Sequence, residues 1–226
     1  MDPSVKRPYR QAARARNAAD TRAAIRTAAA ALFLEHGYTA TSMRQIAAAA
    51  GVGERTLYDA FPNKESLFLH VVGVAIVGDE GAETLAQRDP FQRVLQAPDA
   101  DATVDALARV STDLLERAGP LLMVALGSAG ADPAMRRFCD EGDTATRANI
   151  RAVVDHLASL GATDRRPAAK RTLTTTLTAL VSPHLHALLR RPDGLGRSAY
   201  EDWLRAALRM SVGLDGTSGP SFTRRP

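Results

Sequence analysis

Apolar residues recur along most of the chain at the three- and four-residue spacing of an α-helix. The first such stripe follows Asp20, a candidate N-cap, and ends at Gly37; its members are Ile25, Ala28, Ala29, Leu32 and Phe33. Residues 1–17 precede it, and Pro3 and Pro8 disfavour an early helix there, so we expect a flexible basic arm.

Short polar or glycine-containing segments separate further stripes, and several of these begin with a proline, which the first helical turn tolerates. Pro183 lies inside one of them and predicts a kink, residues 89–99 are expected to form a loop, and Asn63 is a candidate N-cap. The predicted helices span 43–50, 54–60, the segment after Asn63, 103–118, 120–129, 133–160, 167–191 and 199–212. The pattern predicts an all-α fold.

Composition narrows the class of protein further. Of the 226 residues 45% are hydrophobic and only 5% aromatic, and this alanine-rich composition favours helices over strands. The single cysteine, Cys139, excludes an internal disulfide framework and a CxxC zinc site. No apolar run reaches 18 residues and no apolar core follows the N-terminal charges, so we expect a cytoplasmic protein without a membrane partner.

Charge is distributed unevenly along the chain. Residues 1–64 carry ten basic and five acidic side chains, whereas the remaining 162 residues carry nineteen and twenty. This asymmetry indicates a basic module for a polyanion joined to a neutral module with another task. A solubilising, arginine-rich tail is the alternative explanation of the charge alone.

The segment 41–64, TSMRQIAAAAGVGERTLYDAFPNK, has the spacing of two short helices that cross at a tight turn. Ala47 would face the crossing, where a larger side chain would separate the helices, and Gly51 can adopt the left-handed conformation that ends the first helix. Val52 and Leu57 would fill the corner. The segment therefore predicts a helix-turn-helix.

The start of the second helix in this motif would carry polar groups into a DNA major groove. There the Arg55 guanidinium could form two hydrogen bonds with a guanine, and Thr56 could contact a thymine methyl or a phosphate. Thr41, Ser42, Tyr58 and Lys64 would contact phosphates of the DNA backbone. Simpler roles remain open: Thr41 as an N-cap, Glu54 as part of a cap, and Tyr58 as packing. The candidate DNA-binding residues are Thr41, Ser42, Arg44, Gly53, Glu54, Arg55, Thr56, Tyr58 and Lys64.

These residues also resemble the N-terminal domain of TetR-type (TetR/AcrR) transcriptional regulators, from about residue 22 to residue 68. The resemblance rests on Phe33, His36-Gly37-Tyr38, Thr41-Ser42, Ile46-Ala47, Ala50-Gly51-Val52, Thr56-Leu57-Tyr58, Phe61 and Lys64-Glu65. It implies a homodimer that binds near-palindromic, double-stranded operator DNA, usually as a repressor, and a larger C-terminal helical domain that binds a small effector. Asp59 and Ala60 stand where the family often carries a bulkier residue, so the operator sequence does not transfer.

Domain boundaries follow from this interpretation: a basic arm over 1–17, a three-helix DNA-binding domain over 18–64, an effector-binding and dimerisation domain over 65–213, and a flexible tail over 214–226. Apolar stripes on the last two predicted helices are candidates for the dimer interface, with burial in the monomer core as the alternative. Their members are Leu177, Val181, His184, Leu188, Trp203, Leu204 and Leu208.

A pocket for a small apolar effector is expected among the middle helices, although each candidate also suits a plain core. The candidates are Phe68, Val72, Ile76, Leu107, Val110, Leu114, Met123, Phe138, Cys139, Thr174 and Thr178. His184 and His186 are two residues apart on a helix and make a poor metal pair, so we expect no metal and no cofactor.

Other functional classes are weaker candidates. The chain has no nucleophile elbow, no glycine-rich phosphate loop and no HExxH motif, so an enzyme is not expected. The favoured prediction is a repressor released from its operator by an effector. A ligand-independent or activating regulator of the same fold, or a non-specific DNA-binding protein, is the alternative.

Overall fold

The structure is a computed structural model that describes residues 6–81 and 83–214. Every regular element in these ranges is a helix, so the all-α prediction is confirmed. The chain divides into two compact units: unit 1 comprises residues up to 79 and residues 120–139, and unit 2 comprises residues 80–119 and those from 140 onward. Of the predicted tail, residues 215–226 lie outside the described residues.

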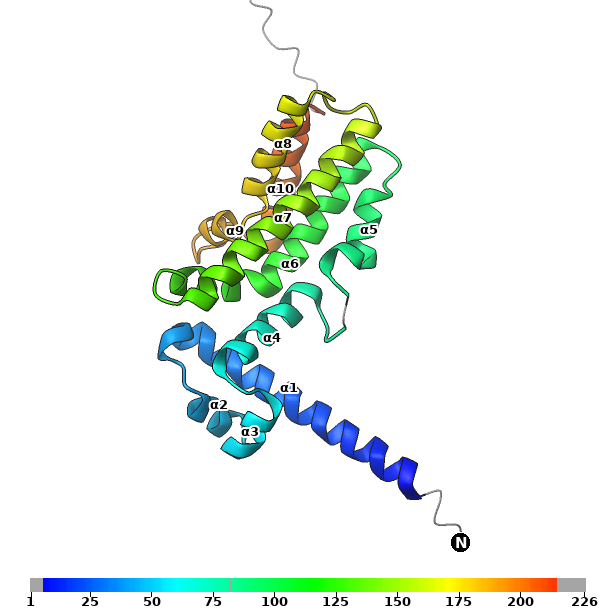
Figure 1. The fold of residues 1–226 in the computed structure, drawn as a ribbon. Coiled ribbons are helices and arrows are strands. Elements are labelled where there is room, and N and C mark those ends of the chain that lie inside the picture. Colours follow the sequence, from blue (N-terminus) through cyan, green and yellow to red (C-terminus); the bar gives the residue numbers. More distant parts are fainter. Residues whose placement is uncertain (1–5, 82, 215–226) are drawn as a thin grey trace, which may run out of the picture. The chain divides into compact units, whose positions relative to one another are not determined.

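Unit 1 contains α1 (Lys6–Ala40), α2 (Met43–Ala50), α3 (Glu54–Ala60) and α4 (Lys64–Val77), drawn in blue and cyan in Figure 1. Residues 120–139 add the end of α6 (Ala100–Ser128) and the start of α7 (Pro133–Ser159). Three aromatic rings lie at the centre of its core: the Phe68 ring packs edge-on against Phe33 and Tyr38, with centroids 5.0 and 5.1 Å away.

The first helix differs from the sequence prediction at its N-terminal end. It begins at Lys6 rather than after Asp20, so residues 6–17 of the predicted arm are helical, and residues 1–5 of that arm lie outside the described residues. Pro8 falls in the first turn, where a missing N–H breaks no intrahelical hydrogen bond. The predicted stop is correct in position, because Gly37 leaves the helical conformation (φ 78°, ψ 169°) and bends the chain there.

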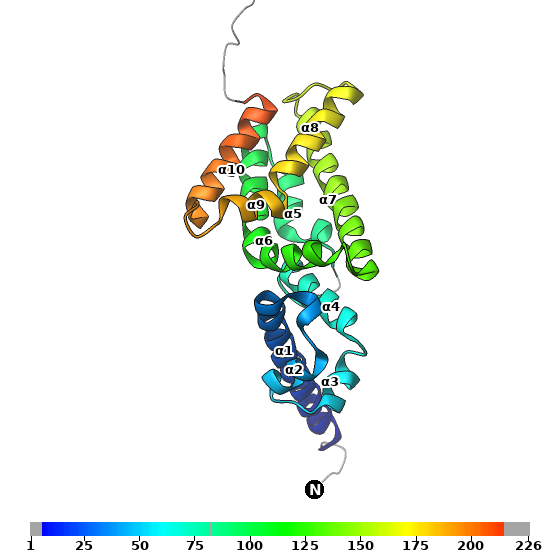
Figure 2. The same cartoon turned by 90° about the vertical axis from the view of Figure 1, so that its left-hand side faces the viewer.

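Unit 2 contains η1 (Leu85–Gln87), α5 (Asp89–Leu95), the larger parts of α6 and α7, α8 (Pro167–Leu180), α9 (Pro183–Leu189) and α10 (Arg197–Val212). Figure 2 shows α8 and α10 side by side, with α9 between their ends. The core of this unit is a cluster of fully buried side chains: Val153, Leu157, Leu177, Tyr200, Leu204 and Leu208.

Two prolines act differently from expectation. Pro120 lies inside a continuous α6 rather than at the start of a new helix. The preceding residue, Gly119, has no Cβ to clash with the proline ring, which removes one barrier to a helical conformation. Pro183 separates α8 from α9 outright instead of kinking one helix, because Ser182 adopts an extended conformation before it and caps α9 by accepting a hydrogen bond from Leu185 N (3.2 Å).

The predicted loop over 89–99 is wrong for its first half, because α5 forms there. Pro90 occupies the first turn of this helix, and Phe91 and Val94 are buried in the unit 2 core. Their three-residue spacing is enough to anchor two helical turns by burial of apolar surface. In the described part of the chain, no helix combines the length and the apolar character that crossing a membrane requires.

Candidate nucleic-acid interface

The turn between α2 and α3 has the geometry predicted for a helix-turn-helix. Gly51 adopts the left-handed conformation (φ 67°), and Val52 N then donates a hydrogen bond to Ala47 O (3.0 Å), which closes the end of α2. Ala47 is 2% exposed at the crossing, and Leu57 is fully buried beneath α3. A residue with a Cβ at position 51 would be strained, so glycine sets the angle at which α3 leaves α2.

The start of α2 is fixed by a capping box. Ser42 Oγ accepts a hydrogen bond from Gln45 N (3.3 Å), and Ser42 N donates one to Gln45 Oε1 (2.8 Å). Arg44 lies on the same turn with an exposed side chain. Ser42 and Arg44 are therefore accessible at the N-terminus of a helix, where backbone N–H groups favour anions such as phosphate.

The exposed surface of α3 collects most of the predicted DNA-binding residues. Leu57 is the one buried residue of this helix, whereas the residues around it are exposed, and Tyr58 retains 48% of its surface. The helix therefore offers one apolar anchor inward and a polar face outward, as a recognition helix requires. The predicted residues on that face and at its N-cap are Gly53, Glu54, Arg55, Thr56 and Tyr58.

A residue that sequence reasoning missed, Arg22 on α1, holds the far end of α3. Its Nη1 donates a hydrogen bond to Ala60 O (3.0 Å), and its guanidinium lies over the Phe61 ring, 4.4 Å from the centroid. The available signal was its spacing: Arg22 precedes the buried Ile25 by three residues, so both share the inner face of α1.

Two predicted DNA-binding residues have different roles in the structure. Thr41 is 1% exposed, and its hydroxyl donates to the carbonyl oxygens of Gly37 (2.8 Å) and Leu32 (3.1 Å). Lys64 Nζ donates to the backbone carbonyl oxygens of Tyr38 (2.8 Å), Thr39 (3.3 Å) and Thr41 (2.9 Å). An ammonium group has three donors. Lys64 therefore satisfies carbonyls at the end of α1 and is not placed to contact phosphate.

Burial changes the pKa of Lys64 and the pKa of the neighbouring Tyr38. Desolvation lowers the pKa of Lys64, and the Asp132 carboxylate partly opposes that shift. Desolvation raises the pKa of Tyr38 to about 12, with further contributions from Asp132 and Glu65. The tyrosine is therefore neutral at physiological pH, and its ring face is available to the lysine cation at 4.5 Å.

The predicted pocket residues are divided between the two units. Phe68 and Val72 are fully buried in the unit 1 core, and Ile76, Met123, Phe138 and Cys139 pack around or near it. Leu107, Val110 and Leu114 belong to the unit 2 core, and Thr174 and Thr178 lie on α8 in the same unit. Met123 lines a cavity of about 390 Å³ in unit 1, and Thr174 lines one of about 530 Å³ in unit 2.

The predicted dimer residues also separate into two groups. Leu177, Leu204 and Leu208 have no exposed surface, because they fill the unit 2 core; for these three the interface prediction is wrong. Leu188 (51% exposed) and His184 lie at the surface of α9, and Val181 and Trp203 are partly buried. Met210 on α10, which belongs to the same apolar stripe as Trp203, is 72% exposed.

Comparison with known proteins decides what this arrangement is. Residues 25–71 match the model for bacterial regulatory proteins of the tetR family. The chain carries a TetR-type DNA-binding domain. The match covers α2, α3 and the capped start of α4, so the helix-turn-helix described above is the one that TetR-type proteins share. A search of curated protein sequences finds no match to this chain.

Solved structures extend the likeness to most of the chain. A transcriptional regulator from Aquifex aeolicus matches 84% of this chain and 98% of its own, with a TM-score of 0.64 and 16% identity. A TetR-family regulator from Pseudomonas syringae matches 85% and 95%, with a TM-score of 0.54 and 23% identity. SmeT in complex with triclosan matches 91% and 98%, with a TM-score of 0.62 and 21% identity. At these identities the likeness establishes the fold alone, which is the helical fold that these three proteins share.

The side chains that could ligate a metal ion are dispersed over the described part of the chain. Among residues 6–81 and 83–214, no three histidine, cysteine, aspartate or glutamate side chains are grouped as metal ligands. His184 is exposed on α9, whereas His186 is buried and lies 3.1 Å from the Glu116 carboxylate through Nε2. The two histidines therefore face different surroundings, as their two-residue spacing predicts.

Proposed function

We propose that this TetR-type regulator is a cytoplasmic repressor that binds a near-palindromic operator as a homodimer. The observation that carries the proposal is α3, which is anchored through Leu57 and Arg22 and presents Arg55 and Thr56 on its outer face. A rigid helix with exposed donors at its N-terminal end is what direct readout of a major groove needs. In this scheme Ser42, Arg44 and Tyr58 contact the phosphate backbone.

Dimerisation would place two recognition helices on one face of the duplex. Half-sites read by such dimers lie about 34–36 Å apart or at multiples of that distance. Two large apolar side chains with high exposure, Leu188 and Met210, support an interface on α9 and α10. Exposure of large apolar side chains is typical of surfaces that another chain covers.

Release by a small molecule is the remaining part of the proposal. Its support is the structural likeness to SmeT, which was solved with triclosan bound. An effector of this kind must bind the DNA-free form more tightly than the operator-bound form, and operator DNA must weaken effector binding by the same factor. The apolar effector expected from the sequence stays a prediction.

The decisive experiment is DNA footprinting of the full-length protein on the region upstream of its own gene. We expect protection of two related half-sites, and a gel shift on the same fragment that resists competition by excess random-sequence duplex. Non-specific binding would be competed away, because its electrostatic part is independent of sequence. Protection of a single half-site, or none, would contradict the dimeric repressor. Loss of the footprint on adding a bound small molecule would establish effector release.

A further inference from the structure

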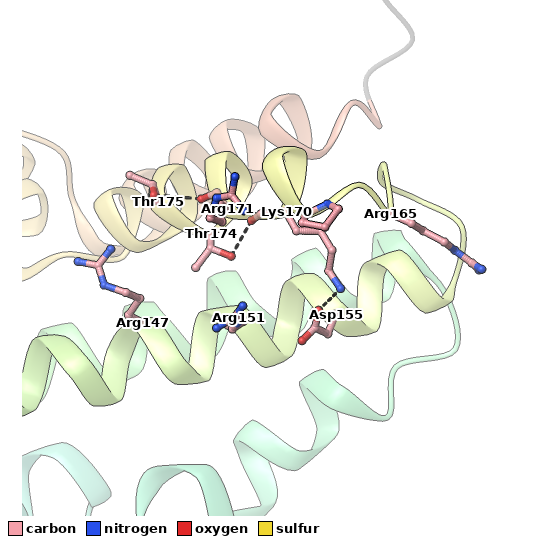
Figure 3. Close-up of a pocket in the computed structure, with 9 residues that line it drawn as sticks. Arg147, Arg151, Asp155, Arg165, Lys170, Arg171, Thr174 and Thr175 are labelled. Atoms are coloured by element: carbon pink, nitrogen blue, oxygen red, sulfur yellow. Dashed lines mark hydrogen bonds and ion pairs between the residues drawn. The ribbon is translucent and has the colours of Figure 1, made fainter.

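A groove between α7 and α8 in unit 2 is lined mainly by cations. The cavity measures about 530 Å³ and includes Arg147, Arg151 and Asp155 of α7 together with Lys170 and Arg171 of α8. The α7 residues are four apart and so lie on one face of that helix. Figure 3 shows them opposite the N-terminal half of α8, where the Thr174 side chain is directed toward α7. Arg165 and Pro167 close the end at the loop that enters α8.

Three of these cations form no ion pair. In the described part of the chain, the guanidinium groups of Arg147, Arg151 and Arg171 make no ion pair or hydrogen bond, whereas Lys170 pairs with Asp155. Arg165 differs too: its Nε donates to Ala158 O (3.1 Å), and its side chain is directed away from the others (Figure 3). The groove therefore carries an excess of positive charge, because its lining has five basic side chains and one carboxylate, that of Asp155.

Several other arginines of unit 2 form ion pairs with carboxylates. On α10, Arg205 contacts Asp105, Glu201 and Asp202, and Arg209 pairs with Asp101. At the C-cap of α9, Arg190 forms a bidentate pair with Glu116. In the described part of the chain Arg93 and Arg109 also form no ion pair, so the three groove arginines are distinguished by lining one cavity. Arg147 and Arg151 are four residues apart on α7, where like charges repel, and Asp143 and Asp155 flank them at the same spacing and partly offset that repulsion.

We propose that the α7–α8 groove binds a compact small molecule that carries two or more negative charges, as carboxylates or as phosphate groups. Guanidinium groups bind both with paired, charge-assisted hydrogen bonds, which is the chemistry that Arg147, Arg151 and Arg171 offer from two helices. The cavity volume falls in the range of about 300–1,000 Å³ typical of small-molecule sites. The inference goes beyond the proposed repressor function and does not depend on it.

The Asp155 carboxylate would compete with an anionic ligand for Lys170. It already pairs with Lys170, so an incoming anion must share that lysine or displace the aspartate. Neutralising Asp155 would remove a repulsive charge from the groove and release the ammonium group to the ligand. The proposal therefore predicts a gain of affinity for one variant and a loss for others, a pattern that a purely structural role for these residues does not produce.

The test is isothermal titration calorimetry on the full-length protein without DNA, with three probes. Citrate and inorganic pyrophosphate distinguish carboxylate from phosphate ligands, and triethyl citrate is the uncharged match of citrate. We expect at least one anion to bind and triethyl citrate not to bind. Arg151→Gln should weaken binding about tenfold, because it removes a charged hydrogen-bond donor. Asp155→Asn should strengthen binding several-fold.

Arg109→Gln is the matched control, since Arg109 is an exposed arginine of α6 outside the groove. It changes the net charge as Arg151→Gln does, and it should leave the affinity within a factor of two. Three results would overturn the proposal: neither anion binds, Arg109→Gln weakens binding as much as Arg151→Gln, or a random-sequence DNA duplex displaces the anion from the wild type. The last result would make the groove a nucleic-acid surface. Because no operator is present, failure here is distinct from failure to repress.

Discussion

The ammonium group of Lys64 lies over the Tyr38 ring, 4.5 Å from its centroid, and also donates a hydrogen bond of 2.8 Å to the Tyr38 carbonyl oxygen. Two further carbonyls, of Thr39 and Thr41, complete its hydrogen bonds. The first residue of α4 thus fastens the segment that joins α1 to α2. The position of the helix-turn-helix depends on this contact as well as on its own turn.

Lys64→Met should therefore act on stability rather than on phosphate binding. We expect the free energy of unfolding to fall by about 1–3 kcal/mol, because partly buried carbonyls lose a charged donor. The salt dependence of operator affinity should stay at the wild-type slope, since no phosphate contact is removed. Urea denaturation and binding at several salt concentrations measure the two quantities separately.

Arg44→Gln supplies the opposite pattern as a control. Arg44 is exposed on α2, so its loss should change stability by less than about 0.5 kcal/mol and lower the salt slope by about one. If Lys64→Met instead lowered the slope and left unfolding unchanged, Lys64 would be the phosphate contact that the sequence suggests.

Arg55 is expected to read a base. Arg55→Ala should weaken operator binding by about 1–3 kcal/mol and relax the preference at one base position in each half-site. Arg55→Lys keeps the charge but lacks the bidentate fork, so it should retain binding to random DNA while losing much of the preference. Competition gel shifts against single-base operator variants measure this. Equal loss on specific and random DNA in Arg55→Ala would remove Arg55 from base readout.

Substitutions at surface residues of α9 and α10 should change the oligomeric state, whereas substitutions at core residues should change stability. Leu188→Arg and Met210→Arg should give folded monomers that bind operator weakly, because each would place an unpaired charge in the proposed interface. Leu204→Ala should instead lower the free energy of unfolding by about 2–5 kcal/mol, since Leu204 is fully buried in unit 2. Light scattering with circular dichroism measures both properties. Dimers that persist in both arginine variants would locate the interface elsewhere.

Lowering the pH should destabilise unit 2, because it protonates the Glu116 carboxylate. Its carboxylate accepts two hydrogen bonds from Arg190 (2.6 and 3.0 Å), and Arg190 is the main cause that holds the pKa of Glu116 below its ordinary value of 4.5. A lowered pKa means that this stabilisation is present above pH 4.5 and is lost as the pH falls through the folded-state value.

Glu116→Gln should accordingly cost about 1–3 kcal/mol of unfolding free energy at pH 7, and the difference from wild type should shrink as the pH falls below 4.5. Urea titrations at pH 7, 4.5 and 3 measure it. Glu141→Gln, at an exposed position of α7, is the control and should follow the wild type throughout. A difference that does not change with pH would assign the effect to packing.

Local signals explain how much of the site could be predicted from the sequence. The bounds of α2 and α3, the left-handed Gly51 and the Asn63 cap were all predicted correctly, because each depends on residues within a few positions of itself. Arg55 and Tyr58 are exposed for the same reason: the spacing around Leu57 decides which side of a seven-residue helix faces inward.

The features that could not be predicted from the sequence depend on contacts between residues far apart in the chain. Lys64 and Thr41 are residue types that often contact phosphate. Only the structure shows that their side-chain donors are hydrogen-bonded to backbone carbonyl oxygens. Leu177 and Leu204 lie on amphipathic stripes that suit a dimer interface or a core equally well, and the helix packed against each stripe decides between them. The groove arginines likewise come from two helices whose adjacency no spacing reveals.

Arg22 offers the last test, because its hydrogen bond to Ala60 O and its position over Phe61 tie α1 to the end of α3. His70, whose ring centroid is 5.1 Å from that of Phe61, reports on it: desolvation is the main cause that lowers the pKa of His70, and the charges of Arg22 and Arg26 lower it further. Removing the Arg22 charge should therefore raise the pKa of His70 toward 6.5.

Arg22→Gln should show that rise in an NMR titration, together with a loss of about 1–2 kcal/mol of unfolding free energy. Operator affinity should fall several-fold at an unchanged salt slope, because α3 is less firmly held while no phosphate contact is lost. Arg22→Lys keeps the charge and so the His70 pKa, but it lacks the planar group that covers Phe61 and should recover the affinity only in part. Full recovery in Arg22→Lys would show that the charge alone matters and that α3 does not depend on this contact for its position.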